Sequence, residues 1–194
     1  MSEPTATPTD RRSATRLRLQ RAALDLFAEH GYDAVSPTDI AAAAGVSERT
    51  FFRHFATKVD SVVGGGDARM TWFLDTLWKQ PSRLPPLEAL LAAIAQEERE
   101  FPPSAEDLAR ARLVRETTTL HETVRSFEGA IEAAFGAWLA ERMDRSPHDF
   151  DVRLAAAVLV ATRRVVFDAW IEADGERSIT ALTREAFEAI DIRL

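Results

Sequence analysis

Residues 36–58, SPTDIAAAAGVSERTFFRHFATK, decide the fold of this 194-residue chain. Ser36 stands three residues before Asp39, which is the pattern of a capping box at the start of a helix. Ser47 offers a second N-cap shortly after Gly45, a residue suited to the tight turn between two helices. The pattern predicts two short helices, over residues 37–44 and 48–55. Two short helices joined by a glycine-containing turn are typical of a helix-turn-helix unit.

The two predicted helices each have an apolar inner face. Phe51 and Phe55 are four residues apart and therefore share one face of the second helix. The residues expected to hold the helices at a fixed angle are Ile40, Ala44, Val46, Phe51 and Phe55. The residues left facing partly outward are Glu48, Arg49, Thr50, Phe52, Arg53 and His54. The second helix therefore presents mainly polar side chains to a partner.

These outward residues suit DNA, because the first residues of the second helix in such a unit reach base edges in the major groove. Arg49 can pair with a guanine edge, and Glu48 can accept a hydrogen bond from the amino group of cytosine. Thr50, His54 and Lys58 suit phosphate oxygens. Each also has an ordinary explanation at a protein surface; Glu48, for example, stabilises a helix N-terminus without any DNA. The ordered set, rather than any single member, predicts double-stranded DNA as a partner.

The stretch Ala22–Lys58 resembles the DNA-binding domain of the TetR (tetracycline-repressor-like) family. The matching residues are Ala23, Leu26, Phe27, Gly31-Tyr32, Ser36, Ile40-Ala41, Ala44-Gly45-Val46-Ser47, Thr50-Phe51-Phe52, His54-Phe55 and Lys58. The resemblance implies a dimer that binds operator DNA and a larger helical domain that senses a small molecule. It also implies that effector binding moves the helix joining the domains and so changes the spacing of the recognition helices.

The resemblance also assigns roles to individual residues. Glu48 and Arg49 stand at base-facing positions. The phosphate-contacting positions are Ser36, Thr50, Phe52, His54 and Lys58. Two residues depart from the usual family pattern. Pro37 replaces an aliphatic residue and suits a first helical turn, whereas Phe52 is often tyrosine, so a hydroxyl-to-phosphate hydrogen bond is missing here.

The rest of the chain is also expected to be helical, because apolar residues recur at helical spacing and no β-hairpin signal occurs. We expect an all-α fold of about nine helices, with a three-helix DNA-binding domain followed by a C-terminal bundle. The expected units are a disordered tail over residues 1–10, the helix-turn-helix domain over 11–58, and a ligand-binding and dimerisation domain over 59–194. Ser104 and Ser146, each with an aspartate three residues later, indicate further helix starts.

Residues 150–172 are apolar on nearly every side, which is typical of a helix that is buried all round. In a short chain, the subunit's own bundle can cover one face of such a helix and a second subunit the other. We therefore expect a homodimer. The alternative is a central helix in a monomeric bundle.

The C-terminal part is similar to regulators of the mycofactocin-repressor type, through TWFLDTL at 71–77, ARLVRET at 111–117 and RLAAAVLVATRRVVFDAW at 153–170. This similarity implies a small-molecule effector, either an acyl-CoA or another hydrophobic ligand. The candidate pocket residues are the large apolar side chains expected around a bundle cavity: Trp72, Phe73, Trp78, Phe101, Leu113, Phe127, Ile131, Phe167 and Trp170. Arg112, Arg115 and Arg125 are candidate anchors for a carboxylate or phosphate, or else surface arginines paired with glutamates.

A connecting helix is expected between Lys58 and Gln80, and it contains three consecutive glycines at 64–66. Each glycine inside a helix costs about 0.5–1 kcal/mol relative to alanine. We therefore interpret the triplet as a hinge between the helix-turn-helix domain, which is the expected DNA reader, and the rest of the ligand-binding domain, which is the expected sensor. The alternatives are close packing of another helix, or a loop that breaks the helix at this point.

Taken over the whole chain, the formal net charge of −7 argues against a protein that binds polyanions such as nucleic acids without specificity. Residues 1–60, however, hold eight basic and eight acidic side chains, so residues 61–194 carry the entire excess. Five arginines and no acid lie within residues 11–21, where they are placed to meet phosphates. A neutral reader and an acidic sensor are compatible with sequence-specific DNA binding.

Catalytic chemistry finds little support in the sequence. The chain has no cysteine, and its four histidines are spaced too widely for a helical metal site. Phosphate-binding glycine motifs and the Gly-x-Ser-x-Gly motif are also missing. We therefore expect no cofactor, no metal and no enzyme activity, a small helical enzyme being one alternative. The other is an architectural DNA-binding protein without an effector, which a close-packed second domain would favour.

The sequence predicts neither a secretory signal nor a membrane span. No apolar stretch follows Met1, and the longest apolar run, residues 154–161, is far too short to cross a bilayer. Arginine outnumbers lysine 22 to 2, and alanine is abundant, which we interpret as a sign of a bacterial source rich in GC. The expected location is the cytoplasm.

Overall fold

The computed structural model describes residues 8–64 and 66–189, which form eleven helical segments and no strand. The segments are α1 (Pro8–His30), α2 (Pro37–Ala43), α3 (Glu48–His54), α4 (Asp60–Val63), α5 (Gly66–Trp78), α6 (Pro86–Glu100), α7 (Ala105–Glu116), α8 (Thr118–Ser126), α9 (Glu128–Met143), α10 (Phe150–Glu172) and α11 (Ile179–Ala189). The predicted all-α architecture is confirmed. The segments exceed the expected number because two expected helices are each divided.

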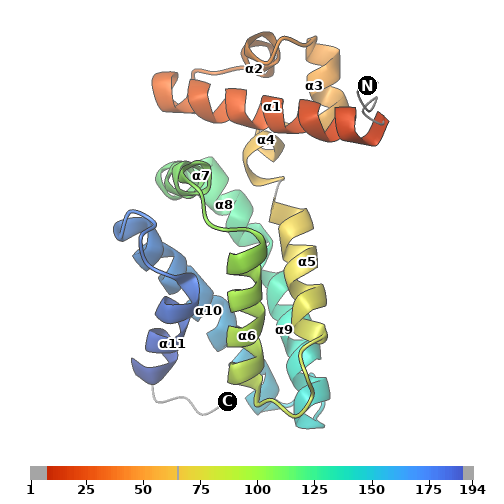
Figure 1. Ribbon diagram of the computed structural model, residues 1–194, viewed down its shortest axis with the longest axis vertical. Coiled ribbons are helices and arrows are strands. Elements are labelled where there is room, and N and C mark those ends of the chain that lie inside the picture. The colour runs from red at the N-terminus through yellow and green to blue at the C-terminus, as the bar shows by residue number, and fades with distance from the viewer. Residues whose placement is uncertain (1–7, 65, 190–194) are drawn as a thin grey trace, which may run out of the picture.

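The helices form two tiers (Figure 1). The upper tier consists of α1, which lies across the top of the bundle, with α2 and α3 on its outer side. In the lower tier, α5, α6, α9, α10 and α11 form an elongated bundle, and α7 lies directly beneath α1. The short α4 joins the tiers, so the tiers communicate through α4 and through the contact between α1 and α7.

The helix-turn-helix unit follows its sequence signals. The Ser36 hydroxyl accepts a hydrogen bond from the Asp39 amide at 3.2 Å, and the Asp39 carboxylate accepts one from the Ser36 amide at 2.8 Å. The Ser36 hydroxyl also donates to the Asp39 carboxylate, and this bond together with the one from the Ser36 amide holds the pKa of Asp39 below its ordinary value. Ser47 caps α3 through the Thr50 amide at 3.2 Å. Gly45 has a φ of +67°, the left-handed conformation that ends α2.

The core of the upper tier contains a side chain from the lower tier. Phe51 and Ile40 are fully buried in this core, as their spacing predicts. Leu120 of α8 is also fully buried and belongs to the same cluster, with Leu113 and Val114 of α7 packed against it. The lower tier therefore completes this core, which includes the inner faces of α1, α2 and α3 and is called the reader core.

Two side chains of the lower tier tie helix ends together. Arg142 of α9 donates hydrogen bonds to the carbonyl oxygens of Gln80 at 2.7 Å and Leu84 at 2.9 Å, which follow the end of α5. Glu98 of α6 accepts a hydrogen bond from the Ile179 amide at 2.6 Å and one from the Thr180 amide at 3.3 Å. Glu98 thus satisfies amides at the start of α11 that have no partner within that helix.

Three helix boundaries differ from those that the sequence predicts. The connecting helix is divided: α4 ends at Val63, α5 begins at Gly66, and Gly65 lies outside the described residues, so the hinge stays a prediction. The expected tail likewise falls outside the described residues over positions 1–7, and α1 begins at Pro8. Apolar residues at helical spacing over 122–143 predict one helix there, but Phe127 separates α8 from α9.

The predicted helix start at Ser146 is wrong, because α10 begins at Phe150 with Asp149 as its N-cap residue. The Asp149 carboxylate accepts hydrogen bonds from Arg145 at 3.0 Å and from the Ser146 amide at 3.3 Å. These bonds close a turn ahead of the helix. At Ser104, by contrast, the expected capping box with Asp107 is present.

Candidate nucleic-acid interface and internal cavity

The outer side of α3 presents the residues predicted to contact DNA. Glu48 and Arg49 are exposed in the first turn of the helix, and Arg53 is exposed one turn later. The Phe52 ring is 48% exposed, an unusual placement for a large apolar side chain. The structure therefore leaves both charged side chains of the first turn open to solvent, as the predicted base contacts require, with an exposed aromatic ring on the same helix.

The hydroxyl groups of this surface are engaged in local hydrogen bonds. The Ser36 hydroxyl donates to the Asp39 carboxylate at 2.5 Å, and the Thr50 hydroxyl lies 3.0 Å from that of Ser47. Each hydroxyl has one donor and two acceptor sites. A phosphate contact at either residue would have to share or replace the local bond.

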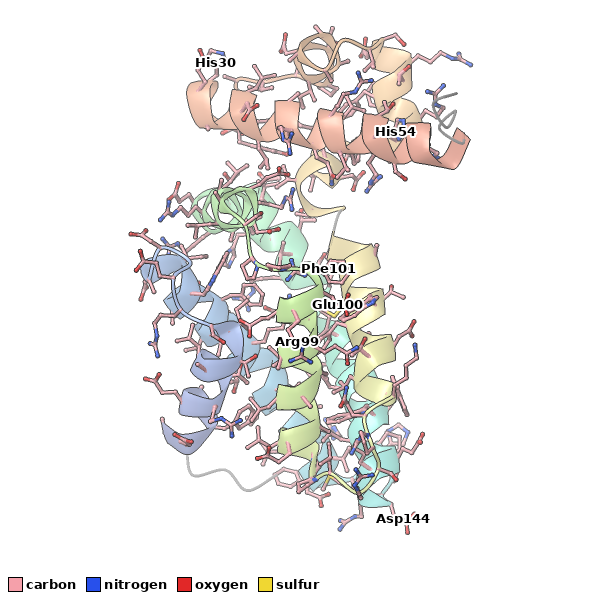
Figure 2. The ribbon with its side chains drawn as sticks, in the orientation of Figure 1. His30, His54, Arg99, Glu100, Phe101 and Asp144 are labelled. Carbon is pink, nitrogen blue, oxygen red and sulfur yellow. The ribbon has the colours of Figure 1, made fainter. Side chains whose placement is uncertain are left out.

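His54 lies half-buried at the C-terminal end of α3, in the upper tier (Figure 2). Burial lowers the pKa of its imidazole, and the positive charges of Arg53, Arg12 and Arg16 lower it further. Because its ordinary pKa is 6.5, His54 is neutral in the free protein near pH 7. In that state only one ring nitrogen can donate a hydrogen bond.

Lys58 has a structural role in addition to its predicted phosphate contact. Its ammonium group donates to the carbonyl oxygens of Tyr32 at 2.8 Å and Val35 at 2.9 Å, and it lies 4.1 Å from the centre of the Tyr32 ring. Two of its three N–H donors therefore hold the turn between α1 and α2. One donor is left for a phosphate oxygen.

The arginines of α1 differ in what they contact. Arg16 donates to the carbonyl oxygen of His54 at 2.9 Å and to that of Gly64 at 2.7 Å, so it joins the ends of α3 and α4. Arg21 forms an ion pair of 3.5 Å with Glu106 of α7. Arg12 and Arg18 are exposed. The basic cluster predicted to meet phosphates therefore also serves contacts within the protein.

The lower tier encloses a cavity of about 610 Å³, to which helices α4 to α11 contribute side chains. Five of the predicted pocket residues line it: Phe73, Phe127, Ile131, Phe167 and Trp170. The other four do not. Trp72 and Phe101 pack on each other with ring centres 5.0 Å apart, Trp78 is exposed at the end of α5, and Leu113 packs against the reader core.

The wall of the cavity contains several arginines. Of the predicted anchors, Arg115 and Arg125 lie in the wall, whereas Arg112 pairs with Asp174 elsewhere. Arg69 and Arg110 also line the cavity, and each pairs with acidic neighbours. Arg163 of α10 was not predicted. Its signal in the sequence is a charged residue inside the long apolar stretch over 150–172.

The segment formed by α7 and α8 faces both functional regions. Val114 lines the cavity and also packs against the reader core. Leu120 enters the reader core, while its neighbour His121 lines the cavity. A ligand that displaces this segment would therefore disturb the packing beneath α1.

Acidic side chains that lie close together in the sequence have structural partners. Glu97 pairs with Arg69 at 2.5 Å, and Asp149 and Asp151 both contact Arg145. Within residues 8–64 and 66–189, no group of three or more His, Cys, Asp or Glu side chains could hold a metal ion. In the same residues, no helix is long and apolar enough to cross a membrane.

Comparisons with known proteins match the N-terminal and the C-terminal part of the chain separately. A family model described as "Bacterial regulatory proteins, tetR family" matches residues 19–60, and one described as "MftR C-terminal domain" matches residues 84–194. The chain is 27% identical over 186 residues to the mycofactocin biosynthesis transcriptional regulator MftR of Mycobacterium tuberculosis, covering 93% of this chain and 91% of that protein. It is 34% identical over 167 residues to the HTH-type transcriptional regulator TcmR of Streptomyces glaucescens, covering 80% and 73%.

Solved structures share the fold. The SmeT–triclosan complex superposes with a TM-score of 0.64 at 18% identity, over 91% of each chain. Thermus thermophilus FadR, a transcriptional repressor in complex with lauroyl-CoA, superposes with a TM-score of 0.59 at 18% identity, over 92% of this chain and 96% of that one. The family model of the MftR C-terminal domain matches more than half of this chain, and the chain is 34% identical to the regulator TcmR. The chain therefore belongs to the TetR family of transcriptional regulators.

Proposed function

We propose that this protein is a homodimeric repressor that binds a palindromic operator through α3 and is released by a small-molecule effector. The observation that carries the proposal is the double role of α7 and α8, which line the cavity and also supply Leu120 to the reader core. An effector in the cavity acts on operator binding if it favours one arrangement of this segment over another. The protein acts on DNA in the bacterial cytoplasm.

On the DNA side, Arg49 and Glu48 read base edges in the major groove, Arg49 at guanine and Glu48 at the amino group of cytosine. Their exposure in the first turn of α3 supports this assignment. The phosphate contacts come from Ser36, Thr50, Phe52, Arg53, His54 and Lys58, with Phe52 contributing only van der Waals contact.

The homodimer forms along α10. Phe150, Leu154 and Val165 are 80%, 53% and 58% exposed, and they share one face of this helix with the exposed Ala161. A continuous apolar stripe of this kind marks an interaction surface. Because the other face of α10 is buried in its own subunit, a second subunit would complete the burial that the sequence predicts.

The effector is a hydrophobic small molecule, and an acyl-CoA-like compound is the leading candidate. A cavity of about 610 Å³ is within the usual range of roughly 300–1,000 Å³ for small-molecule sites. The lauroyl-CoA bound by FadR of Thermus thermophilus, which shares this fold, supports an acyl-CoA. The cavity speaks against an architectural DNA-binding protein without an effector.

Selection of bound DNA from a random pool, repeated in the presence of lauroyl-CoA, tests this function. We expect a palindromic site with one preferred half-site spacing, and recovery that falls when the effector is added. Arg49→Ala should relax the preference at one position of each half-site, whereas Arg83→Ala, an exposed arginine between α5 and α6, should not. If no palindrome emerges, the dimeric repressor is wrong. If Arg49→Ala leaves the preference unchanged, the assigned base contact is wrong.

A further inference from the structure

The cavity wall holds a cation that has no hydrogen-bonding partner in the part of the chain that the structure describes. Arg163 lies half-buried in the wall, with its guanidinium carbon 5.1 Å from the centre of the Phe167 ring. Among the described residues it forms no hydrogen bond and no ion pair within 4.0 Å, although a guanidinium carries five N–H donors. Burial disfavours its charge and lowers its pKa, which the carboxylates of Glu97 and Glu128 only partly oppose. A desolvated cation in this condition requires an anionic partner.

Two further donors in the same wall lack partners. Arg110 Nε and Trp170 Nε1 are buried nitrogen atoms without an acceptor in the described part of the chain. Trp170 lies seven residues after Arg163, so the two side chains project from the same side of α10. A Cβ atom added at Gly175 would lie 3.3 Å from the Trp170 ring, so the indole is held in place by close packing. These donors therefore lack acceptor atoms in the described part of the chain.

Three acidic residues of the wall have close partners within the protein, whereas Glu128 lies only within 4.0 Å of Arg125 and Asp168 has no hydrogen bond or ion pair among the described residues. Glu98 accepts hydrogen bonds at the start of α11, and Asp107 accepts them in the capping box with Ser104. Glu97 is paired with Arg69. The polar groups left open toward a ligand are thus mainly donors, and the chemistry they fit is an oxygen-rich anion.

We propose that the cavity binds an amphipathic anion whose carboxylate or phosphate oxygens accept hydrogen bonds from Arg163. The apolar body of this ligand lies against Phe73, Leu90, Ile131 and Phe135, which line the cavity and belong to the core of the lower tier. Arg110 and Trp170 provide additional donors near the head group. This inference rests on the proposed effector function of the cavity and names the residue that selects the charge of the effector.

Calorimetric titration of the full chain with matched twelve-carbon probes tests the proposal. The probes are dodecanoate, dodecyl phosphate, dodecanol and dodecyltrimethylammonium. We expect at least one of the two anions to bind about tenfold or more tightly than dodecanol, as for a charge-assisted hydrogen bond. Arg163→Met should reduce the affinity for that anion to the level of dodecanol and leave dodecanol binding unchanged. Arg153→Met, an exposed arginine of α10 outside the cavity wall, is the control that should change neither.

A second readout separates ligand binding from a structural role. If Arg163 served the fold by pairing with Glu97 or Glu128, Arg163→Met would lower the melting temperature of the ligand-free protein. We expect this temperature to stay equal or to rise, because the variant removes a half-buried charge that has no hydrogen-bonding partner among the described residues. The rise in melting temperature that saturating anion produces in the wild type should be lost.

A cavity that binds the alcohol as well as both anions, or that prefers the ammonium probe, overturns the proposal, as does an anion affinity that Arg163→Met leaves intact. Lauroyl-CoA distinguishes the two sources of the anion: if Arg163→Met weakens it and not dodecanoate, the oxygens come from phosphate, and the reverse result assigns a free carboxylate. Anions that bind at Arg163 without releasing operator DNA would disprove the effector function and leave this inference standing.

Discussion

Replacement of Arg16 tests how the recognition helix is joined to the connecting segment. The guanidinium group donates to the carbonyl oxygens of His54 and Gly64 at 2.9 and 2.7 Å, and it lies 4.4 Å from the centre of the Phe55 ring. Both carbonyls are at helix C-terminal ends, where a cation also interacts favourably with the helix dipole. Arg16→Met keeps an apolar stem and removes both hydrogen bonds and the charge.

The size of the effect follows from these contacts. A hydrogen bond to a charged group contributes about 1.5–3 kcal/mol, and a cation over a ring at a partly exposed site adds about 0.5–1 kcal/mol. Because Arg16 is half-buried, water can reach the freed carbonyls in the variant, and we expect a total loss of about 2–3 kcal/mol. In a chain of this length, 1 kcal/mol corresponds to roughly 2–4 °C. The melting temperature should therefore fall by roughly 4–12 °C.

Thermal unfolding of the full chain, followed by circular dichroism at one fixed protein concentration, measures this fall. Arg16→Lys should show an intermediate loss, because an ammonium group cannot reproduce the planar fork that spans two carbonyls. Arg18→Met, an exposed arginine of the same helix, is the matched control and should change stability by less than about 0.5 kcal/mol. If Arg16→Met is no less stable than this control, the bridge between α3 and α4 contributes nothing and the reasoning is refuted.

Three further predictions concern other contacts. A DNA phosphate favours the charged form of His54, whose pKa is lowered in the free protein, so operator affinity should rise as the pH falls from about 8 to 6. His54→Gln should flatten this dependence in fluorescence anisotropy, and an identical profile would contradict the phosphate contact. Glu98→Ala should lower the free energy of unfolding by about 1–2 kcal/mol, against no change for the exposed Glu100→Ala, as measured in urea. Leu120→Ala should cost about 2–5 kcal/mol, and a loss below about 1 kcal/mol would show that the reader core does not depend on it.

The features predicted well from the sequence are those with local causes. The caps at Ser36 and Ser47 are hydrogen bonds between residues three apart, so the sequence itself contains both partners. The burial of Phe51 and Phe55 follows from their spacing on one short helix. The helix-turn-helix unit is made almost entirely of such short-range signals, which is why its position and inner face could be predicted.

The features missed depend on contacts between distant residues. Spacing identifies an apolar face but does not say which neighbour covers it, so Trp72 and Phe101 were expected in the cavity and instead pack on each other. Leu113 faces the reader for the same reason. The partners of Arg16, 38 and 48 residues away, could not be read from a cluster of arginines. Arg163 was not predicted because α10 also carries Arg164 and Asp168, and its composition does not say which of these charged side chains lacks a partner.

The insertion of Leu120 into the upper tier has an evolutionary consequence. A regulator could change its chemical sensitivity by acquiring a new C-terminal half, but here such an exchange would leave a hole in the hydrophobic core of the upper tier. Recombination near residue 64 is therefore restricted to donors whose α7–α8 segment fills that hole. Among relatives of this chain, substitutions at Leu120 should be matched by size changes at the reader residues around it, so that the two halves diverge together.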